Sequence, residues 1–316
     1  MQKSKIYLKQ GFTLIEVLVV LVILGFIVAM AAQVFMKDDD QKRFDETRLR
    51  MAEIKKTILG SSGSYTNGQR QFAGYAADMG GLPNLVDENG VADPNGQPKG
   101  LWTRDFNADG DTIDFVDIPD SVIWGYRAIS RTWMGWRGPY IEVPPLRTGE
   151  VPGQEKLNDG WGNPFRFTIG GGDITIESYG ADNINDVGGE TGYDVDIEIT
   201  IREAEYMAPL AGRVKLPSVL PGYTSPVTVS LYVPLNGVET LLNPTPDAIS
   251  GDQFDADQYF RFETGAVGTG LYNGNIPVGL RSIFISDSTP VPNTKTAQRI
   301  ITIEPTGNWL GDIEIQ

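Results

Sequence analysis

An apolar segment, Phe12–Met36, restricts what the N-terminal part of this chain can become. The segment spans 25 residues, and every residue from Val17 to Ala32 is apolar or Gly. As an α-helix it would extend about 37 Å, enough to cross the hydrocarbon core of a bilayer. Residues 1–11 carry three Lys and no acid. We therefore expect a membrane-spanning helix whose basic leader stays on the cytoplasmic side.

One acidic residue, Glu16, lies inside this apolar segment. A carboxylate at that depth costs about 3 kcal/mol on insertion scales, and such residues usually have a partner and a role. A second interpretation is that Glu16 lies near the headgroups without a specific partner. The pattern alone leaves both interpretations open.

The junction itself resembles a known processing signal. The stretch KQGFTLIEVLVVLVILG, residues 9–25, is similar to the type III signal of type IV pilins and pseudopilins. The resemblance implies that prepilin peptidase cleaves between Gly11 and Phe12, and that Phe12 is then N-methylated. Glu16 becomes the fifth residue of the mature chain, where the family has its Glu. Loss of the three leader lysines takes the formal charge from −15 to −18.

The cleavage that this resemblance implies gives Glu16 a partner. A new α-amino group at Phe12 can pair with Glu16 of a neighbouring subunit, so neither buried charge stays unpaired. The rival interpretation is an ordinary secretory signal peptide, because Ala29-Met30-Ala31 resembles a small-x-small cleavage site. Glu16 and the length of the apolar run argue against it, since apolar regions of signal peptides are about 7–15 residues long.

The helix is expected to continue beyond the apolar segment. After Met36 the chain is rich in charges, and four apolar residues recur at helical spacing. These residues are Phe44, Met51, Ile54 and Ile58. No Pro interrupts 12–59, and Gly60 is a suitable C-terminal stop. We predict one helix over 12–59, about 70 Å long. Its first half is apolar all round, and its amphipathic second half packs on a globular head.

Composition excludes several classes of function. The chain has no Cys and no His, so disulfides, thiolate nucleophiles, Ser-His-Asp triads and the usual zinc sites are ruled out. A net charge of −15 disfavours binding to nucleic acid. Phosphate-binding loops and HExxH motifs do not occur in the sequence. We expect a protein that is not an enzyme, with a membrane-anchored enzyme as a weaker alternative.

A first candidate calcium loop lies in the Gly-rich stretch 61–136. In DFNADGDTIDFVD, the residues Asp105, Asn107 and Asp109, followed by a Gly, match the first positions of a calcium loop. The position of the usual closing acid is a Val, so Asp114 or Asp117 would have to close the site instead. The alternative is an acidic surface turn. Four Trp residues lie near this loop, and core packing is their expected role: Trp102, Trp124, Trp133 and Trp136.

A second candidate calcium loop comes with a further resemblance. NDGWGNPFRF (158–167) and DITIESYGADNINDVGGETGYDVDIEI (173–199) resemble the C-terminal half of the major pseudopilin of type II secretion systems. Gly160 stands where that family has Pro. The resemblance implies calcium bound in the loop between the last strands, and the matching acids are Asp182 and Asp196. Asp194 is adjacent to the second of these, and Asp186 lies inside the loop. Carboxylates and carbonyls are the ligands that calcium prefers. A solvated turn is the alternative.

The remaining chain indicates β structure. FRFTI and DITIESY are predicted to form a hairpin. A linker that contains several Pro residues is expected over 202–226. Five later stretches alternate as strands do: VTVSLYVPL, QYFRFETG, LRSIFISD, QRIITIEP and DIEIQ. The predicted fold is α+β, with the long helix packed on a small antiparallel-sheet pilin head, followed by a β-sandwich-like domain. The expected segments are 1–11 (leader), 12–59 (helix), 60–202 (pseudopilin-like head) and 203–316 (β domain).

These observations favour a filament subunit. The resemblance implies a homo-oligomer, built through the N-terminal helix by an inner-membrane assembly platform and its ATPase. The precursor would reside in the inner membrane, and the filament would be periplasmic or extracellular. Type IV pilus and type II secretion pseudopilus both stay open. The alternative is a minor or tip pilin whose C-terminal β domain is an adhesin or a cargo-binding module.

Overall fold

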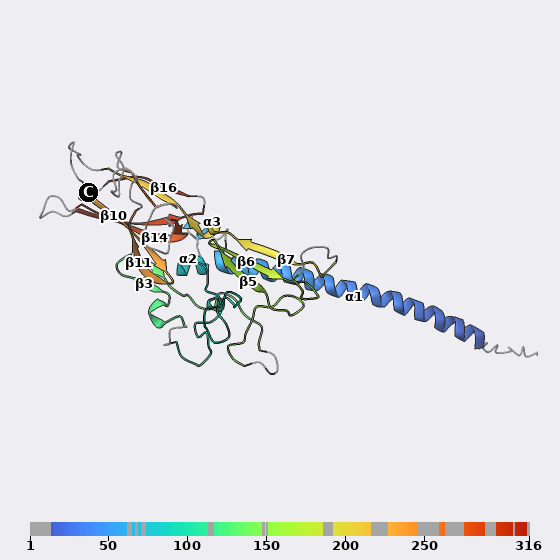
Figure 1. Cartoon of the computed structure of the whole chain (residues 1–316). Coiled ribbons are helices and arrows are strands. Elements are labelled where there is room, and N and C mark those ends of the chain that lie inside the picture. Colours follow the sequence, from blue (N-terminus) through green and yellow to red (C-terminus); the bar gives the residue numbers. More distant parts are fainter. Residues whose placement is uncertain are drawn as a thin grey trace, which may run out of the picture.

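The computed structural model describes most of the chain beyond the leader. Described residues are 14–61, 65–66, 69–70, 74–112, 117–146, 149, 151–185, 192–215, 227–244, 259–262, 275–287, 295–305 and 307–314, with the side chains of 29–38 and of a few strand ends left out. They form a mixed α+β structure with one long N-terminal helix and several antiparallel sheets. Figure 1 shows the helix projecting from a head that carries the sheets.

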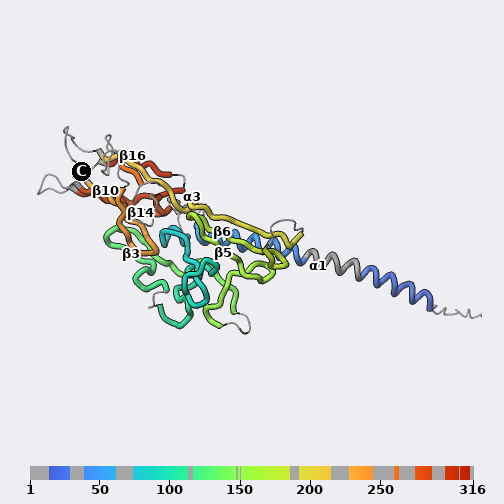
Figure 2. Tube along the Cα trace, in the orientation of Figure 1, coloured from blue at the N-terminus to red at the C-terminus, as the bar shows by residue number. Residues whose placement is uncertain are grey.

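The long helix α1 (Leu14–Leu59) is continuous, as the absence of Pro predicted. Its N-terminal half projects from the head, and its C-terminal half packs against the head (Figure 2). Met51, Ile54 and Ile58 are buried, so three of the four predicted apolar residues face the core. The helix ends where Gly60 adopts φ 82° and donates its N–H to the Lys56 carbonyl. A left-handed residue of this kind is a common helix stop.

A three-stranded antiparallel sheet covers this half of α1. Its order is β5-β6-β7, with bounds β5 (Arg166–Gly170), β6 (Asp173–Ser178) and β7 (Ile197–Ile201). Both strands of the predicted hairpin are confirmed. Ile174, Ile176 and Ile201 are fully buried and join the helix residues in one core cluster. Alternate residues of β6 point outward, which is the pattern of a sheet with one covered face.

Close packing explains the Gly at 160. A Cβ at this position would lie 2.1 Å from the carbonyl oxygen of Arg43 on α1, so a side chain cannot be accommodated. The Gly160 N–H also donates to Thr47 Oγ1 at 2.9 Å, a bond that Pro could not make. The turn therefore lies directly on the helix, which the Pro of the resembled family would prevent at this separation.

The stretch between the helix and this sheet is mostly irregular, as its turn residues predicted. It contains short elements only: β1 (Tyr65–Thr66), β2 (Gln69–Arg70), α2 (Tyr75–Met79), η1 (Lys99–Leu101), η2 (Asp120–Val122), β3 (Gly125–Arg127) and β4 (Thr132–Met134). Trp102 and Trp136 are buried, as expected. For Trp133 the core prediction is wrong, because this side chain is 55% exposed on the outer side of the β3–β4 hairpin.

The C-terminal part contains two larger sheets that share a second buried cluster. A four-stranded sheet has the order β11-β10-β14-β15, from β10 (Val227–Leu235), β11 (Val238–Leu242), β14 (Gly279–Asp287) and β15 (Lys295–Ile303). A three-stranded sheet has the order β12-β9-β16, from β9 (Leu210–Lys215), β12 (Tyr259–Phe262) and β16 (Asn308–Glu314). The five strands predicted here are all confirmed.

The predicted linker at 202–226 is wrong in its first half. Residues 203–215 form α3 (Glu203–Tyr206), β8 (Met207–Ala208) and β9, and β8 pairs with β13 (Ile276–Pro277). Strand β9 is the central strand of its sheet, pairing antiparallel with β12 and parallel with β16. Its partners follow it by dozens of residues, so the pairing left no local signal in the sequence.

Helix α2 joins the C-terminal sheets to the head. Arg281 of β14 is 2% exposed, and its guanidinium donates to the carbonyls of Pro277, Val278, Leu280 and, at 3.1 Å, Ala77 of α2. One of these carbonyl groups therefore belongs to the head. This buried cation is one of the contacts between the two parts of the chain, together with the bond from the Gly237 N–H to the Met79 carbonyl at 2.9 Å.

A buried carboxylate lies at the other side of α2. Asp78 is 2% exposed, and Arg137 donates to both of its oxygens at 2.6–2.9 Å. The Tyr140 hydroxyl adds a third donor at 3.1 Å. Burial nevertheless raises the pKa of Asp78 from 3.8 to about 6, although the bonds from Arg137 and Tyr140 act to lower it.

This raised pKa predicts a particular pH dependence. Between about pH 4 and pH 6 the folded chain retains the Asp78 proton that the unfolded chain has released, so the folded state binds more protons. As the pH rises from about 4 to 6, the contribution of Asp78 to the free energy of unfolding should fall, by roughly 3 kcal/mol for a pKa that is raised by about two units. Urea unfolding followed by Trp fluorescence should show this fall in the wild type.

The variant Asp78→Asn isolates the effect from the other acids. Its free energy of unfolding should lack the Asp78 contribution, so the difference between wild type and variant should change between pH 4 and 6 and be constant above. Glu53→Gln, on the exposed side of α1, is the matched control and should leave the pH profile unchanged. A difference that stays flat from pH 4 to 7 would contradict the assignment.

Candidate functional site

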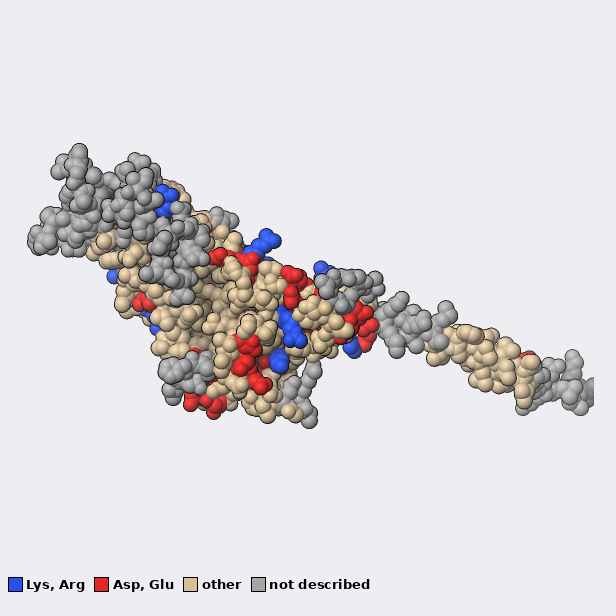
Figure 3. Space-filling model, in the orientation of Figure 1, with Lys and Arg blue, Asp and Glu red and all other residues tan. Residues whose placement is uncertain are grey.

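The first part of α1, residues 14–28, exposes an apolar surface on all its sides. The large apolar side chains from Leu14 to Val28 are 49–83% exposed in the single chain. In Figure 3 this part of the helix is almost free of charge, whereas the head carries both signs. Exposed apolar surface of this extent indicates contact with lipid or with other protein chains. Glu16 is the acid in the first turn of the helix.

The predicted cleavage site precedes the described residues. Gly11 and Phe12 both fall outside them, so the pairing of the Phe12 amine with Glu16 stays a prediction. Over the side chains that the structure describes, no helix reaches the length and hydropathy expected of a membrane span. Side chains 29–38 of the predicted apolar segment are not among them. The membrane span therefore stays a prediction as well.

Three carboxylates of the first predicted calcium loop lie together. Oxygens of Asp105, Asp109 and Asp117 are all within 4.8 Å of one another. Asp114 lies outside the described residues, so its part in the loop stays untested. The sequence identified Asp117 only as a substitute for the usual closing acid, and it is this residue that reaches the cluster. The fold thus closes the loop with an acid twelve residues after Asp105.

Local hydrogen bonds hold these carboxylates in place. Asp105 Oδ2 accepts the Gly110 N–H at 2.9 Å, and Asp117 Oδ1 accepts the Phe106 N–H at 2.7 Å. Gly110 has φ 95°, so the tight turn at this position requires a left-handed residue. Asp105 Oδ1 is buried and makes no hydrogen bond within the part of the chain that the structure describes. A buried carboxylate oxygen without a donor is unfavourable unless a cation approaches it.

A buried lysine supports the same loop. Lys99 is 2% exposed, and its ammonium donates to the carbonyls of Phe106 and Glu88 at 2.5 and 3.0 Å. Burial lowers the pKa of Lys99, and surrounding carboxylates, Asp105 among them, act in the opposite direction. The atoms of this loop that could bind a cation are the carboxylate oxygens of Asp105, Asp109 and Asp117. Hard oxygen ligands of this kind suit calcium rather than a transition metal.

The second predicted calcium loop shows a different arrangement. Asp182 and Asp194 are exposed, and Asp182 Oδ1 accepts the N–H of Ile184, which is an ordinary Asx turn. Among the described residues, the acids at 182, 194 and 196 do not form a group of three comparable to that at 105–117. Asp186 lies outside the described residues. Calcium binding in this loop stays a prediction.

Comparison with known proteins identifies the N-terminal segment. A family model, the prokaryotic N-terminal methylation motif, matches residues 8–32. This is the prepilin signal of type IV pilin-like proteins, and it covers both Glu16 and the predicted Gly11–Phe12 junction. The match is limited to this segment. No curated protein and no solved structure matches the chain.

Proposed function

We propose that this chain is the precursor of a structural subunit of a type IV pilus-like filament or a type II secretion pseudopilus. One observation carries the proposal: the methylation motif at 8–32 overlaps the start of a single 46-residue helix, and the large apolar side chains from Leu14 to Val28 of this helix are exposed. Packed against copies of itself, this helix would bury in the filament core the apolar surface that a single chain exposes.

The assembly cycle follows from the leader and the helix. The precursor would be anchored in the inner membrane, and prepilin peptidase would remove residues 1–11 and allow N-methylation of Phe12. The new amine would pair with Glu16 of a neighbouring subunit. The resemblance further implies an assembly platform and an ATPase as partners, and we assign no catalytic step to the chain itself. The filament would be periplasmic or extracellular.

The head favours a pseudopilin-like subunit, and the C-terminal sheets favour a specialised one. The segments 158–167 and 173–199 are the regions that resemble the major pseudopilin. The C-terminal sheets have their own buried cluster and lie at the end of the molecule remote from the projecting helix (Figure 1). A terminal position of that kind suits a minor or tip pilin whose β domain binds a surface or a secreted cargo.

Mass spectrometry of the N-terminal peptide tests this proposal. Full-length protein extracted from membranes should begin at Phe12 and carry one additional methyl group. The variant Gly11→Val should leave the leader attached, which serves as the control for processing. A mature chain that begins near Ala32 would identify a secreted soluble protein and would overturn the filament function.

We also propose that the head binds calcium, at Asp105, Asp109 and Asp117. The proposal rests on the proximity of these carboxylates and on the buried oxygen of Asp105. An ion there would bridge Asp105 and Asp117, the two ends of the loop. Calcium that binds only the folded chain stabilises it by about 2.7 kcal/mol at a hundredfold excess over Kd.

Calcium should therefore raise the Tm of the processed protein by about 5 °C or more. The variant Asp109→Asn, which keeps the size of the side chain, should lose most of this shift. Asp194→Asn, in the second predicted loop, should keep it if the ion binds at 105–117. The reverse pattern would assign calcium to the second loop, and magnesium at the same concentration checks specificity. A Tm that does not respond to calcium would contradict both sites.

A further inference from the structure

The β3–β4 hairpin presents a row of exposed rings and a cation. Tyr126 lies opposite Trp133 across the hairpin, and their ring centroids are 5.9 Å apart. Trp124 also stacks on Trp133, with ring centroids 6.2 Å apart, and the Arg137 guanidinium lies 4.4 Å from the centroid of the Trp124 ring. Tyr126 and Trp133 are 54% and 55% exposed. Exposed apolar side chains that are gathered in one place, rather than scattered singly, mark a candidate interaction site.

The charge of this hairpin is opposite to that of the whole chain. Residues 121–141 contain three Arg and no acid, within a chain of net charge −15. Arg131 is exposed in the turn between the strands. Tyr, Trp and Arg are the residue types that most often anchor protein–protein interfaces. We call Trp124, Tyr126, Arg131 and Trp133 the arginine–aromatic face.

A carboxylate row on the head has the complementary charge. Glu177 of β6 lies directly opposite Glu198 of β7 on the uncovered side of the sheet. Burial, together with Glu198 and Asp196, raises the pKa of Glu177. Like charges in directly opposed positions destabilise a sheet unless a cation lies nearby. Arg166 of β5 faces Glu177 from the other side, so Glu198 forms the outer end of the row.

The segment of the chain that carries this row is strongly acidic. Residues 173–201 contain eight acids and no Lys or Arg. Within the chain this is the counterpart of the basic hairpin. A partner that brings an arginine to Glu198 would relieve the repulsion between the opposed glutamates.

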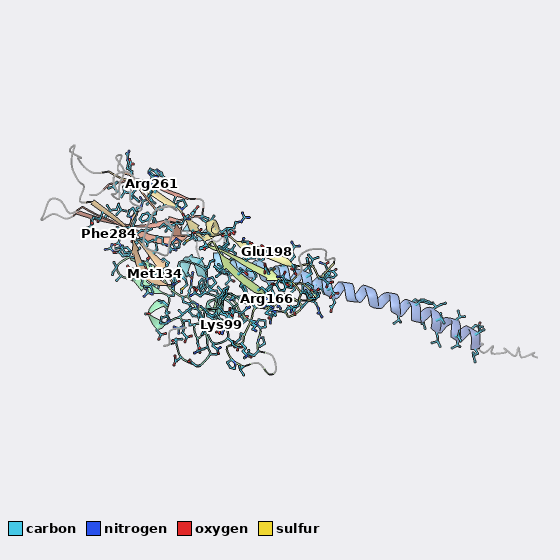
Figure 4. All side chains as sticks on the ribbon, viewed as in Figure 1. Lys99, Met134, Arg166, Glu198, Arg261 and Phe284 are labelled. Carbon is cyan, nitrogen blue, oxygen red and sulfur yellow. The ribbon has the colours of Figure 1, made fainter. Side chains whose placement is uncertain are left out.

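The two surfaces lie at different ends of the head and cannot meet within one chain. The β3–β4 hairpin is remote from the point where α1 leaves the head, whereas β6 and β7 flank α1 near that point (Figure 1). Figure 4 shows the same separation between Met134 of β4 and Glu198. A contact between two different surfaces of identical subunits is heterologous, and repeated it builds an open filament.

We infer that the arginine–aromatic face of one subunit binds the carboxylate row of the next, with Arg131 approaching Glu198. The occupant of the exposed rings is thus a second copy of this chain. The inference rests on the proposed filament function and adds a contact between heads to the contact between helices. Charge complementarity selects the partner surface, and the exposed rings supply apolar area to be buried.

Crosslinking tests the contact directly, because the chain has no Cys. Ala128→Cys on the hairpin and Thr200→Cys beside Glu198 leave the charged and aromatic side chains in place. Treatment of filaments from the double variant with a short bismaleimide should give a ladder of dimers, trimers and longer products. Each single variant should give no ladder, since a heterologous contact needs both positions. Ala92→Cys with Thr200→Cys is the matched control and should stay monomeric.

A charge exchange tests the same contact by its strength. Arg131→Glu should lower the amount of sheared filament by about tenfold, as expected for loss of an interface anchor. Glu198→Arg in the same chain should restore most of it. Trp133→Ala should lower it without being rescued by Glu198→Arg.

The outcomes separate this contact from the filament function. Processed, filamentous protein without a ladder would overturn the contact and leave the filament function intact. Dimers from a single cysteine variant would show a symmetric contact and would also overturn it. Protein that is neither processed nor filamentous would overturn both proposals. Trp133-dependent binding of a polysaccharide by filaments that give no ladder would assign the rings to a sugar ligand instead.

Discussion

Replacing Glu16 by Leu should abolish filaments while leaving the N-terminal cleavage unchanged. Glu16→Leu removes the carboxylate that the Phe12 amine of the neighbouring subunit needs as a partner. Removal of one member of a buried charge pair costs about 3–5 kcal/mol, and the loss recurs at every subunit of the filament. Filament in the sheared fraction should fall by about a hundredfold or more, since 1.4 kcal/mol corresponds to a factor of ten.

The cleavage should survive because the substitution lies beyond the scissile bond and keeps the segment apolar. The N-terminal peptide of Glu16→Leu should therefore begin with methylated Phe12, as in the wild type. Ile15→Leu, at the adjacent exposed position, is the matched control and should assemble normally. Wild-type amounts of filament from Glu16→Leu would show that Glu16 has no partner of importance and lies simply near the headgroups.

Local sequence patterns predicted the elements whose stability is local. The continuous helix to Leu59 followed from apolar spacing, a missing Pro and Gly60. The β5–β6 hairpin followed from alternation around a glycine turn, and β6 alternates in burial as predicted. Each of these signals comes from residues that are near one another along the chain, so neighbouring side chains decide the conformation before distant ones contribute.

Features that depend on distant partners were not predictable. Pro residues on both sides of residues 210–215 suggested a linker, yet β9 is central because β12 and β16 both pair with it. Trp133 was expected in the core on composition, although β4 points it outward. The candidate calcium loop was recognised by its first acids and by Asp117 as one of two possible closing acids, but only the fold shows that Asp117 joins Asp105 and Asp109.

The buried Arg281 had no sequence signal at all, and its removal should have the largest effect on stability. Arg281→Met keeps the apolar stem but leaves four carbonyl groups without their donor. Unsatisfied buried groups of this kind cost about 1–3 kcal/mol each before relaxation, so a total loss of about 3–5 kcal/mol is expected. The loss should appear as a lower urea midpoint of the processed full-length protein.

The part of the chain that unfolds at lower urea in Arg281→Met shows which contact Arg281 stabilises. Trp309 lies in the C-terminal sheets and the other Trp residues lie in the head, so a chain that keeps Trp309 alone reports on the C-terminal part. Because Arg281 bonds Ala77 of α2, its replacement should separate the two transitions, with the Trp309 signal changing at lower urea. Arg299→Met, exposed on the adjacent strand β15, is the matched control and should change stability by about 0.5 kcal/mol or less. Coincident transitions at the wild-type midpoint would show that the junction is held by apolar packing rather than by this guanidinium.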